Sequence, residues 1–179
     1  MALVVKNVVS NRFRNPQVGG GQAILSQKIK VSRPALALPQ TTTEQLFRIY
    51  GGRVLIHLLL GEVTTVIQST DPVLKVSYAA LTDANALVGT AYDIASTLDL
   101  SSDEVGTLYS VEGDGTALIS GNQVAGSVEA FSTGWVAAQG EIYITTGASK
   151  TGAIKWDLWY EPLDNGAYVT SVNTATAAI

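Results

Sequence analysis

The chain of 179 residues has no cysteine, a single histidine (His57) and few charged side chains, which make up 15% of its residues. Without cysteine, the chain can form neither disulfides nor thiolate metal sites. With only one histidine as well, a single chain does not supply the ligands of a common zinc site. His57 lies among leucines, which is more typical of a packed side chain, or of several copies meeting at a symmetry axis, than of a catalyst. We therefore expect no bound metal and no cofactor.

Long apolar runs are also missing. A membrane-spanning helix needs roughly 18 to 20 consecutive apolar residues, and the longest run here, residues 54–60, is interrupted by His57. The N-terminal sequence MALVVKNVV is too short, and too soon polar, for a secretory signal. The sequence predicts a soluble protein that is made in the cytoplasm and has no membrane partner.

Motifs for catalysis and nucleotide binding are absent too. The glycines at 19–21 lack the lysine and the serine or threonine of a phosphate loop, and EGDG at 112–115 lacks the ligand spacing of an EF-hand. Asp157 and Glu161 would share a strand face with Trp159, and this is the carboxylate pair that glycan hydrolysis would require testing first. Nothing else in the sequence indicates a cleft. We predict that the protein is not an enzyme.

Apolar residues, by contrast, make up 46% of the chain, which leaves little polar surface for an isolated monomer. Charge is unevenly distributed: residues 1–53 hold eight basic side chains and one acid, whereas the rest holds three lysines and fourteen acids. Such asymmetry suits a basic segment that binds an acidic protein surface, on another copy or on a different protein. Nucleic acid is the alternative, but the basic residues are not clustered with aromatic ones, so no direct nucleic-acid contact is expected.

The most regular apolar pattern lies at residues 45–68, on both sides of Gly51 and Gly52. A glycine pair between two apolar runs predicts a β-hairpin, because glycine adopts positive φ without steric cost. Both faces of the run at 54–60 are apolar apart from His57, which places it inside a two-layer β structure. Gly61 would mark a bulge at which this strand bends.

Further strands are predicted around residues 73–81, 97–100, 108–111, 116–120, 135–138, 140–147, 153–163 and 167–172, with one helical turn from Ser101 to Glu104. The strand segment at 153–163 would direct Ile154, Trp156 and Leu158 to one face and Trp159 to the other. This pattern of eight to ten strands predicts an all-β fold, an antiparallel β-sandwich of jelly-roll type. We divide the chain into an extended N-terminal arm and connecting segment, residues 1–40, and a sandwich domain, residues 41–179.

The N-terminal segment has two interpretations. Residues 2–9 form a short apolar run that contains Val4 and Val5, and a glycine-rich basic loop joins this run to the rest. An arm of this kind can dock on another chain; an ordinary first strand of the sheet is the alternative. In both interpretations Pro34 and Pro39 restrict the connecting segment to an extended or edge position.

Three stretches carry a resemblance to known proteins: LFRIYGGRVLIHLLLGEVTTVIQSTDPVLKVSY at 46–78, GTAYDIASTLDLSSDEVGTLYSV at 89–111 and GEIYITTGASKTGAIKWDLWYEPLDNGAYV at 140–169. Their spacing and turn residues resemble those of tailed-bacteriophage virion proteins encoded among the head genes. The resemblance implies a jelly-roll-like capsid cement or decoration protein, a homotrimer that binds the major capsid protein on the virion surface. The first 40 residues fall outside it.

The expected function is therefore to bind the outer capsid shell, bridge neighbouring capsomers and stabilise the head. A tail-associated module that binds a receptor or a glycan through the Trp159 face is the alternative. The residues that we expect to contact the capsid or another subunit are Val4, Val5, Arg12, Phe13, Arg14, His57 and Trp159.

Overall fold

The computed structural model describes residues 28–40, 42–68, 73–111, 119–120, 134–147 and 151–175, which form strands, turns and loops without a helix. The strands are β1 (Ile29–Ala37), β2 (Thr43–Tyr50), β3 (Val54–Gln68), β4 (Val73–Ala80), β5 (Tyr92–Asp99), β6 (Leu108–Ser110), β7 (Ile119–Ser120), β8 (Trp135–Ala137), β9 (Gly140–Thr146), β10 (Thr151–Pro162) and β11 (Tyr168–Ser171). The all-β fold class predicted from the sequence is confirmed.

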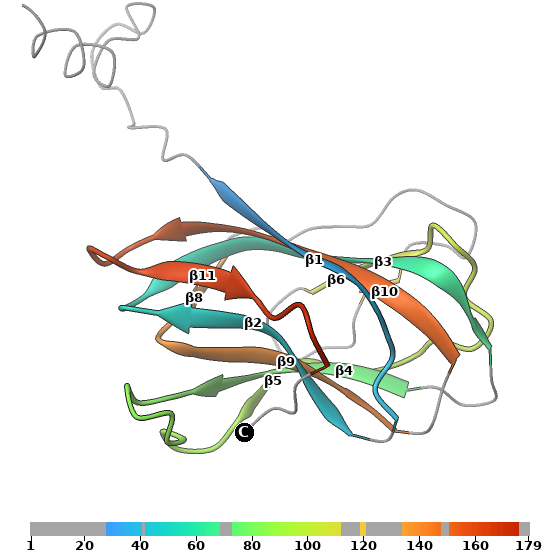
Figure 1. The fold of residues 1–179 in the computed structure, drawn as a ribbon, viewed down its shortest axis with the longest axis horizontal. Helices are drawn as coiled ribbons and strands as arrows, with labels where there is room; N and C mark the ends of the chain where they lie inside the picture. The colour runs from blue at the N-terminus through green and yellow to red at the C-terminus, as the bar shows by residue number, and fades with distance from the viewer. Residues whose placement is uncertain are drawn as a thin grey trace, which may run out of the picture.

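These strands form two antiparallel sheets that pack face to face (Figure 1). The six-stranded sheet has the order β1-β10-β3-β6-β7, and β8 pairs with β3 beside β6. The five-stranded sheet has the order β11-β2-β9-β4-β5. The molecule is thus an antiparallel sandwich.

The strand pairing is nested along the chain. The first strand pairs with a late one, β1 with β10; then β2 pairs with β9, β3 with β6, and β4 with β5. Each inner pair lies between the members of the outer pair in sequence, while successive strands from β1 to β4 alternate between the two sheets. Most neighbours in each sheet are therefore distant in the sequence.

The predicted hairpin at Gly51 and Gly52 is wrong. The strands on either side of this turn, β2 and β3, belong to different sheets, so the turn carries the chain across the sandwich. Both glycines do have positive φ, as a tight turn requires. A Cβ on Gly51 would meet the Gly166 carbonyl oxygen at 2.5 Å, so the neighbouring turn also requires glycine here.

Strand β1 lies within the range that the sequence division places in the arm and connecting segment. It pairs with β10 from Ile29 to Ala37, with an irregularity between Arg33 and Leu36 that includes Pro34, and it forms one edge of the six-stranded sheet. The edge position agrees with the proline argument, because proline cannot donate a ladder hydrogen bond. The sandwich therefore starts before residue 41, and the arm up to residue 27 lies outside the described residues.

A buried ion pair joins the two sheets along this edge. Arg33 of β1 donates to the Glu44 carboxylate of β2, and the Arg33 Nε donates to the Val172 carbonyl oxygen at 2.8 Å. Both ionic side chains are almost fully buried. Burial lowers the pKa of Arg33, and the Glu44 charge acts in the opposite direction. A buried charge requires such a partner, so this pair fixes β1 against β2.

Several local predictions are confirmed and others are corrected. β6 and β7 pair as the second predicted hairpin, although its loop at 112–118, including EGDG, lies outside the described residues. β5 runs from Tyr92 to Asp99 and is longer than the predicted strand at 97–100. Residues 101–106 form turns and not a helical turn, because a capping box without a following amphipathic segment does not sustain a helix. Altogether the described residues form eleven strands, compared with the eight to ten that the sequence predicted.

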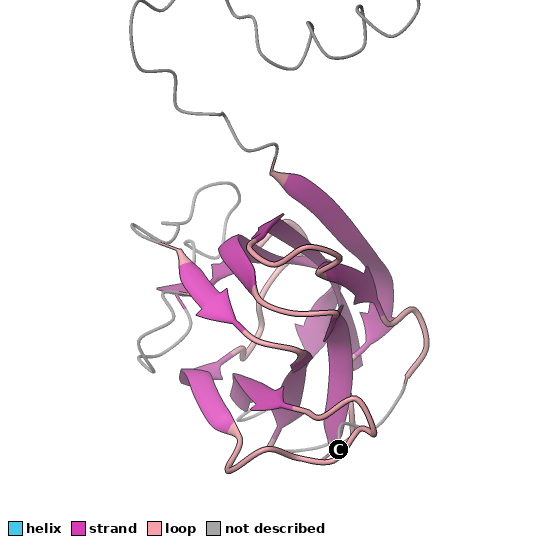
Figure 2. Ribbon diagram, turned by 90° about the vertical axis from the view of Figure 1, so that its left-hand side faces the viewer, coloured by secondary structure: helices cyan, strands magenta, loops and turns pink. Residues whose placement is uncertain are grey.

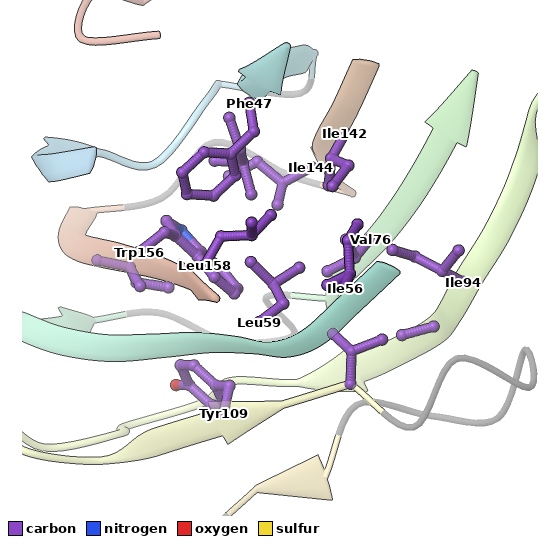
Figure 3. Packing of buried hydrophobic residues seen from close by; sticks show 14 of the residues in the cluster. Phe47, Ile56, Leu59, Val76, Ile94, Tyr109, Ile142, Ile144, Trp156 and Leu158 are labelled. Atoms are coloured by element: carbon purple, nitrogen blue, oxygen red, sulfur yellow. The ribbon is translucent and has the colours of Figure 1, made fainter. Parts of the chain in front are cut away.

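The core lies between the sheets, where Phe47 and Ile142 of one sheet meet Leu59 and Trp156 of the other (Figure 3). As predicted, Trp156 shares a buried row of β10 with other apolar side chains: Ile154, Leu158 and Tyr160.

Opposite Trp156 in the ladder stands Gly61 of β3. A Cβ on Gly61 would lie 2.8 Å from the indole Cζ3, so glycine is needed here to leave room for the ring. The register shifts between β3 and β10 lie elsewhere, so the predicted bulge at Gly61 is wrong.

We expect the Gly61→Ala substitution to lower the free energy of unfolding by about 1 to 3 kcal/mol, the usual cost of overpacking, because the new methyl group overlaps the six-membered ring of Trp156. Urea denaturation followed by circular dichroism measures this change. In a Trp156→Phe background, where that ring is missing, the same substitution should cost much less. An equal cost in both backgrounds would show that the indole is not the source.

Candidate interaction surface

The outer face of the six-stranded sheet carries the two predicted contact residues that the structure describes. On β10, Trp159 alternates with the buried row and points away from the core, as do Asp157 and Lys155. In the ladder, Trp159 stands opposite Leu58 of β3 on one side and Lys30 of β1 on the other. Cross-strand partners share a face, so these three side chains form a row across the sheet.

Strand β3 adds a group of leucines to this face. Leu58 stands opposite Trp159, Leu60 opposite Asp157 and Leu55 opposite Glu161, and all three leucines are half-buried. A register shift between Trp159 and Tyr160 leaves His57 as the extra residue on β3, the arrangement of a β-bulge. The bulge brings His57 onto the same face as the leucines. We call Leu55, His57, Leu58, Leu60 and Trp159 the leucine face.

Lys30 covers part of Trp159. Its ammonium nitrogen lies 4.8 Å from the centroid of the Trp159 ring and 3.0 Å from an Asp157 carboxylate oxygen. The cation is thus attracted both by the ring face and by the acid next to it. A residue of β1 therefore holds the indole in place. The same lysine covers part of the ring face.

His57 makes the second polar contact on the leucine face. Its Nε2 lies 3.5 Å from a Glu161 carboxylate oxygen, and this buried nitrogen makes no hydrogen bond within the described residues. The His57 side chain is 21% exposed. The imidazole is thus mostly covered, and its exposed part lies on the leucine face beside one acid.

Two carboxylates of this surface are engaged in ion pairs, and a third lies near the imidazole. Asp157 pairs with Lys30 and Glu62 pairs with Lys155 at 2.7 Å, whereas Glu161 lies 3.5 Å from His57, a contact that is ionic only when the histidine is protonated. The Glu62 hydrogen bond raises the pKa of Lys155. Asp157 and Glu161 therefore have partners of their own, which weakens the case for a hydrolytic pair. Among the described residues, no cluster of histidine, aspartate and glutamate could hold a metal ion.

Of the predicted contact residues, His57 and Trp159 come together on the leucine face. The others, Val4, Val5, Arg12, Phe13 and Arg14, precede residue 28 and lie outside the described residues. Sequence reasoning assigned the leucines only to an apolar strand. Their common face with Trp159 follows from the register of β3 and β10, which periodicity alone does not contain.

Sequence reasoning also missed a polar layer on the outer face of the five-stranded sheet. Arg48 of β2 contacts the fully buried Glu141 of β9 at 3.6 Å and donates to the Asn85 side chain. Gln45 donates to the same Glu141 carboxylate at 2.5 Å. Polar residues that are buried and mutually bonded in this way stabilise the pairing of β2 and β9. The two outer faces of the sandwich thus differ in chemistry.

Comparisons of the chain with protein-family models, with curated proteins and with solved structures found no match. In the part of the chain that the structure describes, no helix is long and apolar enough to cross a membrane.

A buried pair of titratable groups lies elsewhere, at Asp103 and Tyr109. The Tyr109 hydroxyl donates to the Asp103 carboxylate, and both residues are buried. Burial, with a smaller effect of Asp99, raises the pKa of Asp103, although the Tyr109 hydrogen bond opposes this rise. Burial and the nearby carboxylate also raise the pKa of Tyr109. The Asp103 backbone carbonyl accepts from the Ile67 amide at 3.1 Å, so the pair fixes a turn against β3.

We expect Asp103→Asn to become more favourable for stability, relative to the unchanged protein, as the pH rises. A carboxyl whose folded pKa lies above its unfolded value of about 3.9 contributes full stability below that value and loses it as the pH rises through the folded pKa. Asparagine does not ionise and still accepts the Tyr109 hydrogen bond. Free energies of unfolding measured from pH 3 to pH 7 check this; a difference that does not change with pH would contradict it.

Proposed function

We propose that the protein is a bacteriophage capsid cement protein. It binds the outer surface of the capsid shell, bridges neighbouring major capsid proteins and stabilises the head. It acts without catalysis, as a homotrimer on the virion surface. The resemblance noted in the sequence suggests this role, and the structural features below support it.

The nested pairing supports the jelly-roll part of this proposal. In a jelly roll the chain folds as a long antiparallel hairpin whose paired strands are then divided between two sheets, and such sandwiches are common in viral capsid proteins. The pairs β1 with β10, β2 with β9, β3 with β6 and β4 with β5 follow this plan. A fold of this type supplies rigidity, which a bridging protein needs, but it does not by itself define a function.

The observation that carries the proposal is the leucine face. Leu55, Leu58 and Leu60 lie with Trp159 on one outward face of the six-stranded sheet, and the Lys30 cation beside them pairs with Asp157. A face made mostly of leucine and tryptophan, with its lysine already paired to an acid, loses little polar hydration on association. We assign it to the contact between subunits of the trimer.

Repetition explains how modest contacts would stabilise a shell. Each buried square ångström of apolar surface contributes roughly 25 cal/mol before the costs of association are subtracted. A trimer that holds several capsid subunits at once makes the later contacts intramolecular, so weak single contacts become durable. The basic N-terminal segment would add an electrostatic contact to acidic capsid surface.

A glycan-binding tail module is the alternative, because Trp159 stands between two acids. The position of Lys30 argues against it. The ammonium group lies over the indole and is bonded to Asp157, so a sugar would have to displace this ion pair before it could stack on the ring. We therefore favour the cement protein.

Leu58→Glu should abolish trimer formation, because it places an unpaired charge at the centre of the leucine face. Sedimentation velocity measures the oligomer, and we expect self-association to weaken at least tenfold. Thr65→Glu, an exposed position on the same strand, is the matched control and should leave the trimer intact. Both variants should unfold within about 1 kcal/mol of the unchanged protein.

Heads that lack the protein should release their DNA at a lower temperature, and added protein should restore heat resistance. The Leu58→Glu variant should restore less than the Thr65→Glu variant. Equal heat resistance with and without the protein would contradict the cement function, whatever the oligomer.

Replacement of Arg12 and Arg14 by serine should weaken binding to heads and also make it less sensitive to salt. Ion pairs at a surface are screened as the ionic strength rises, whereas apolar contacts are not. Binding isotherms at low and high salt separate the two contributions. The control is Lys155→Ser, which removes a cation from the sheet itself. An unchanged salt dependence after the arginine replacements would remove the N-terminal segment from the contact.

A further inference from the structure

Large exposed apolar side chains gather at one end of the sandwich. At this end β2 passes to β3, β10 passes to β11, and residues 82–92 join β4 to β5; it lies at the left of Figure 1 and faces the viewer in Figure 2. We call it the tyrosine end and define it by residues 50–53, 82–92, 135–139 and 163–168, with Ile29 beside them. It holds eight of the ten large apolar side chains exposed among the described residues: Ile29, Tyr50, Leu87, Val88, Tyr92, Val136, Leu163 and Tyr168. Val66 and Val105 lie at the opposite end.

Hydrogen bonds between the loops make the tyrosine end rigid. Gln139 accepts from the Gly51 amide at 3.2 Å and donates to Asp83 at 2.8 Å, so it ties two loops together. Asp164 accepts from the Arg53 amide at 2.7 Å and from the Arg53 guanidinium at 2.8 and 2.9 Å. These bonds hold the pKa of Asp164 at about 2. Because the loops are braced before binding, little conformational entropy is lost when a partner covers them.

The composition of the tyrosine end is that of a contact surface. Its four segments contain no lysine and no glutamate, and its charged side chains are Arg53, Asp83 and Asp164. Arg53 pairs with Asp164, and Asp83 accepts from Gln139. Interface centres are similarly enriched in aromatic residues and arginine and depleted in lysine and glutamate. Tyr50 and Tyr168 stack on each other with centroids 5.2 Å apart, and Arg48 lies 5.6 Å from the Tyr50 centroid. The Tyr50 ring is thus already occupied, which disfavours a sugar as the partner.

The basic N-terminal segment joins the body at this same end. Ile29, the first residue of β1, pairs with Tyr160, near the point where β10 leaves the sheet. The 27 residues that precede Lys28 carry Lys6, Arg12 and Arg14 and contain no acid. The segment that enters β1 at this end therefore has a net side-chain charge of +3 over residues 1–27. A partner that presents an apolar patch bordered by carboxylates would match both the apolar tyrosine end and the basic charge of this segment.

We infer that the tyrosine end is the surface that faces the capsid shell, so that the sandwich stands on the shell at the end where β1 begins. The occupant is a protein surface with an apolar centre and an acidic border. This inference rests on the proposed function and adds to it the orientation of the molecule. The leucine face, on the side of the sandwich, is then free to contact other subunits.

The test uses heads that lack the protein and measures how much purified full-length protein sediments with them. Val88→Glu puts a charge on the tyrosine end, where Val88 is 52% exposed. Its matched control is Val105→Glu at the opposite end, where Val105 is 58% exposed. We expect Val88→Glu to weaken binding to heads at least tenfold and Val105→Glu to change it less than twofold. Leu163→Glu, also exposed at the tyrosine end, should reproduce the loss, and thermal unfolding should show that all three variants are folded.

The outcomes separate the inference from the function on which it rests. If the unchanged protein does not sediment with heads, both are wrong. If it sediments and the three variants bind equally well, the cement function stands and the orientation is wrong. If Val88→Glu dissociates the oligomer while each subunit still binds heads, the tyrosine end contacts a second copy and the inference is overturned.

Discussion

The close fit of β10 against β3 positions both the core of the sandwich and the outer surface of the six-stranded sheet. The inner row of β10 fills the core, and Trp156 is accommodated only because Gly61 leaves space for its ring. The outer row of the same strand carries Lys155, Asp157 and Trp159. Since the two rows alternate along one backbone, a shift in register by one residue would exchange core and surface. Packing of the indole therefore also fixes the place of Trp159 among the leucines.

Much of the fold could be predicted from residue patterns, whereas the partners of the strands could not. Alternation identified β10, β9 and β4, and glycine identified the turn at Gly51 and Gly52. The glycines did not show whether the turn joins neighbouring strands of one sheet or crosses between the two sheets, because both kinds of turn use residues with positive φ. The choice is made by distant residues: Glu141 and Ile142 of β9 occupy the edge of β2 that a hairpin would have used.

The candidate contact residues, too, could be identified from the sequence while their neighbours could not. His57 and Trp159 stand out as unusual residues in a sequence, but their common face with Leu58 depends on a bulge set by pairing across 100 residues. The exposed side chains of residues 82–92 lie in the least periodic part of the chain, where pattern gives little information.

The surfaces of the sandwich have a clear division of chemistry. The five-stranded sheet covers its outer side with mutually bonded polar groups, among them Arg48 and Glu141. The six-stranded sheet presents leucines, and the tyrosine end presents aromatic and aliphatic side chains between braced loops. Tyr109, whose pKa burial raises strongly, lies on neither outer face and is packed with Asp103 under a turn. One outer face is thus polar and internally bonded, whereas the leucine face and the tyrosine end carry half-buried or exposed apolar side chains.

Nested pairing also constrains the order in which the protein can be made. The partner of β1 is β10, which the ribosome completes only at residue 162. Until then β1 has no partner strand with which to pair. The innermost pair, β4 with β5, is local and can form early. Synthesis thus delays the pairing of β1, the strand that residues 1–27 precede, until nearly all of the sandwich exists.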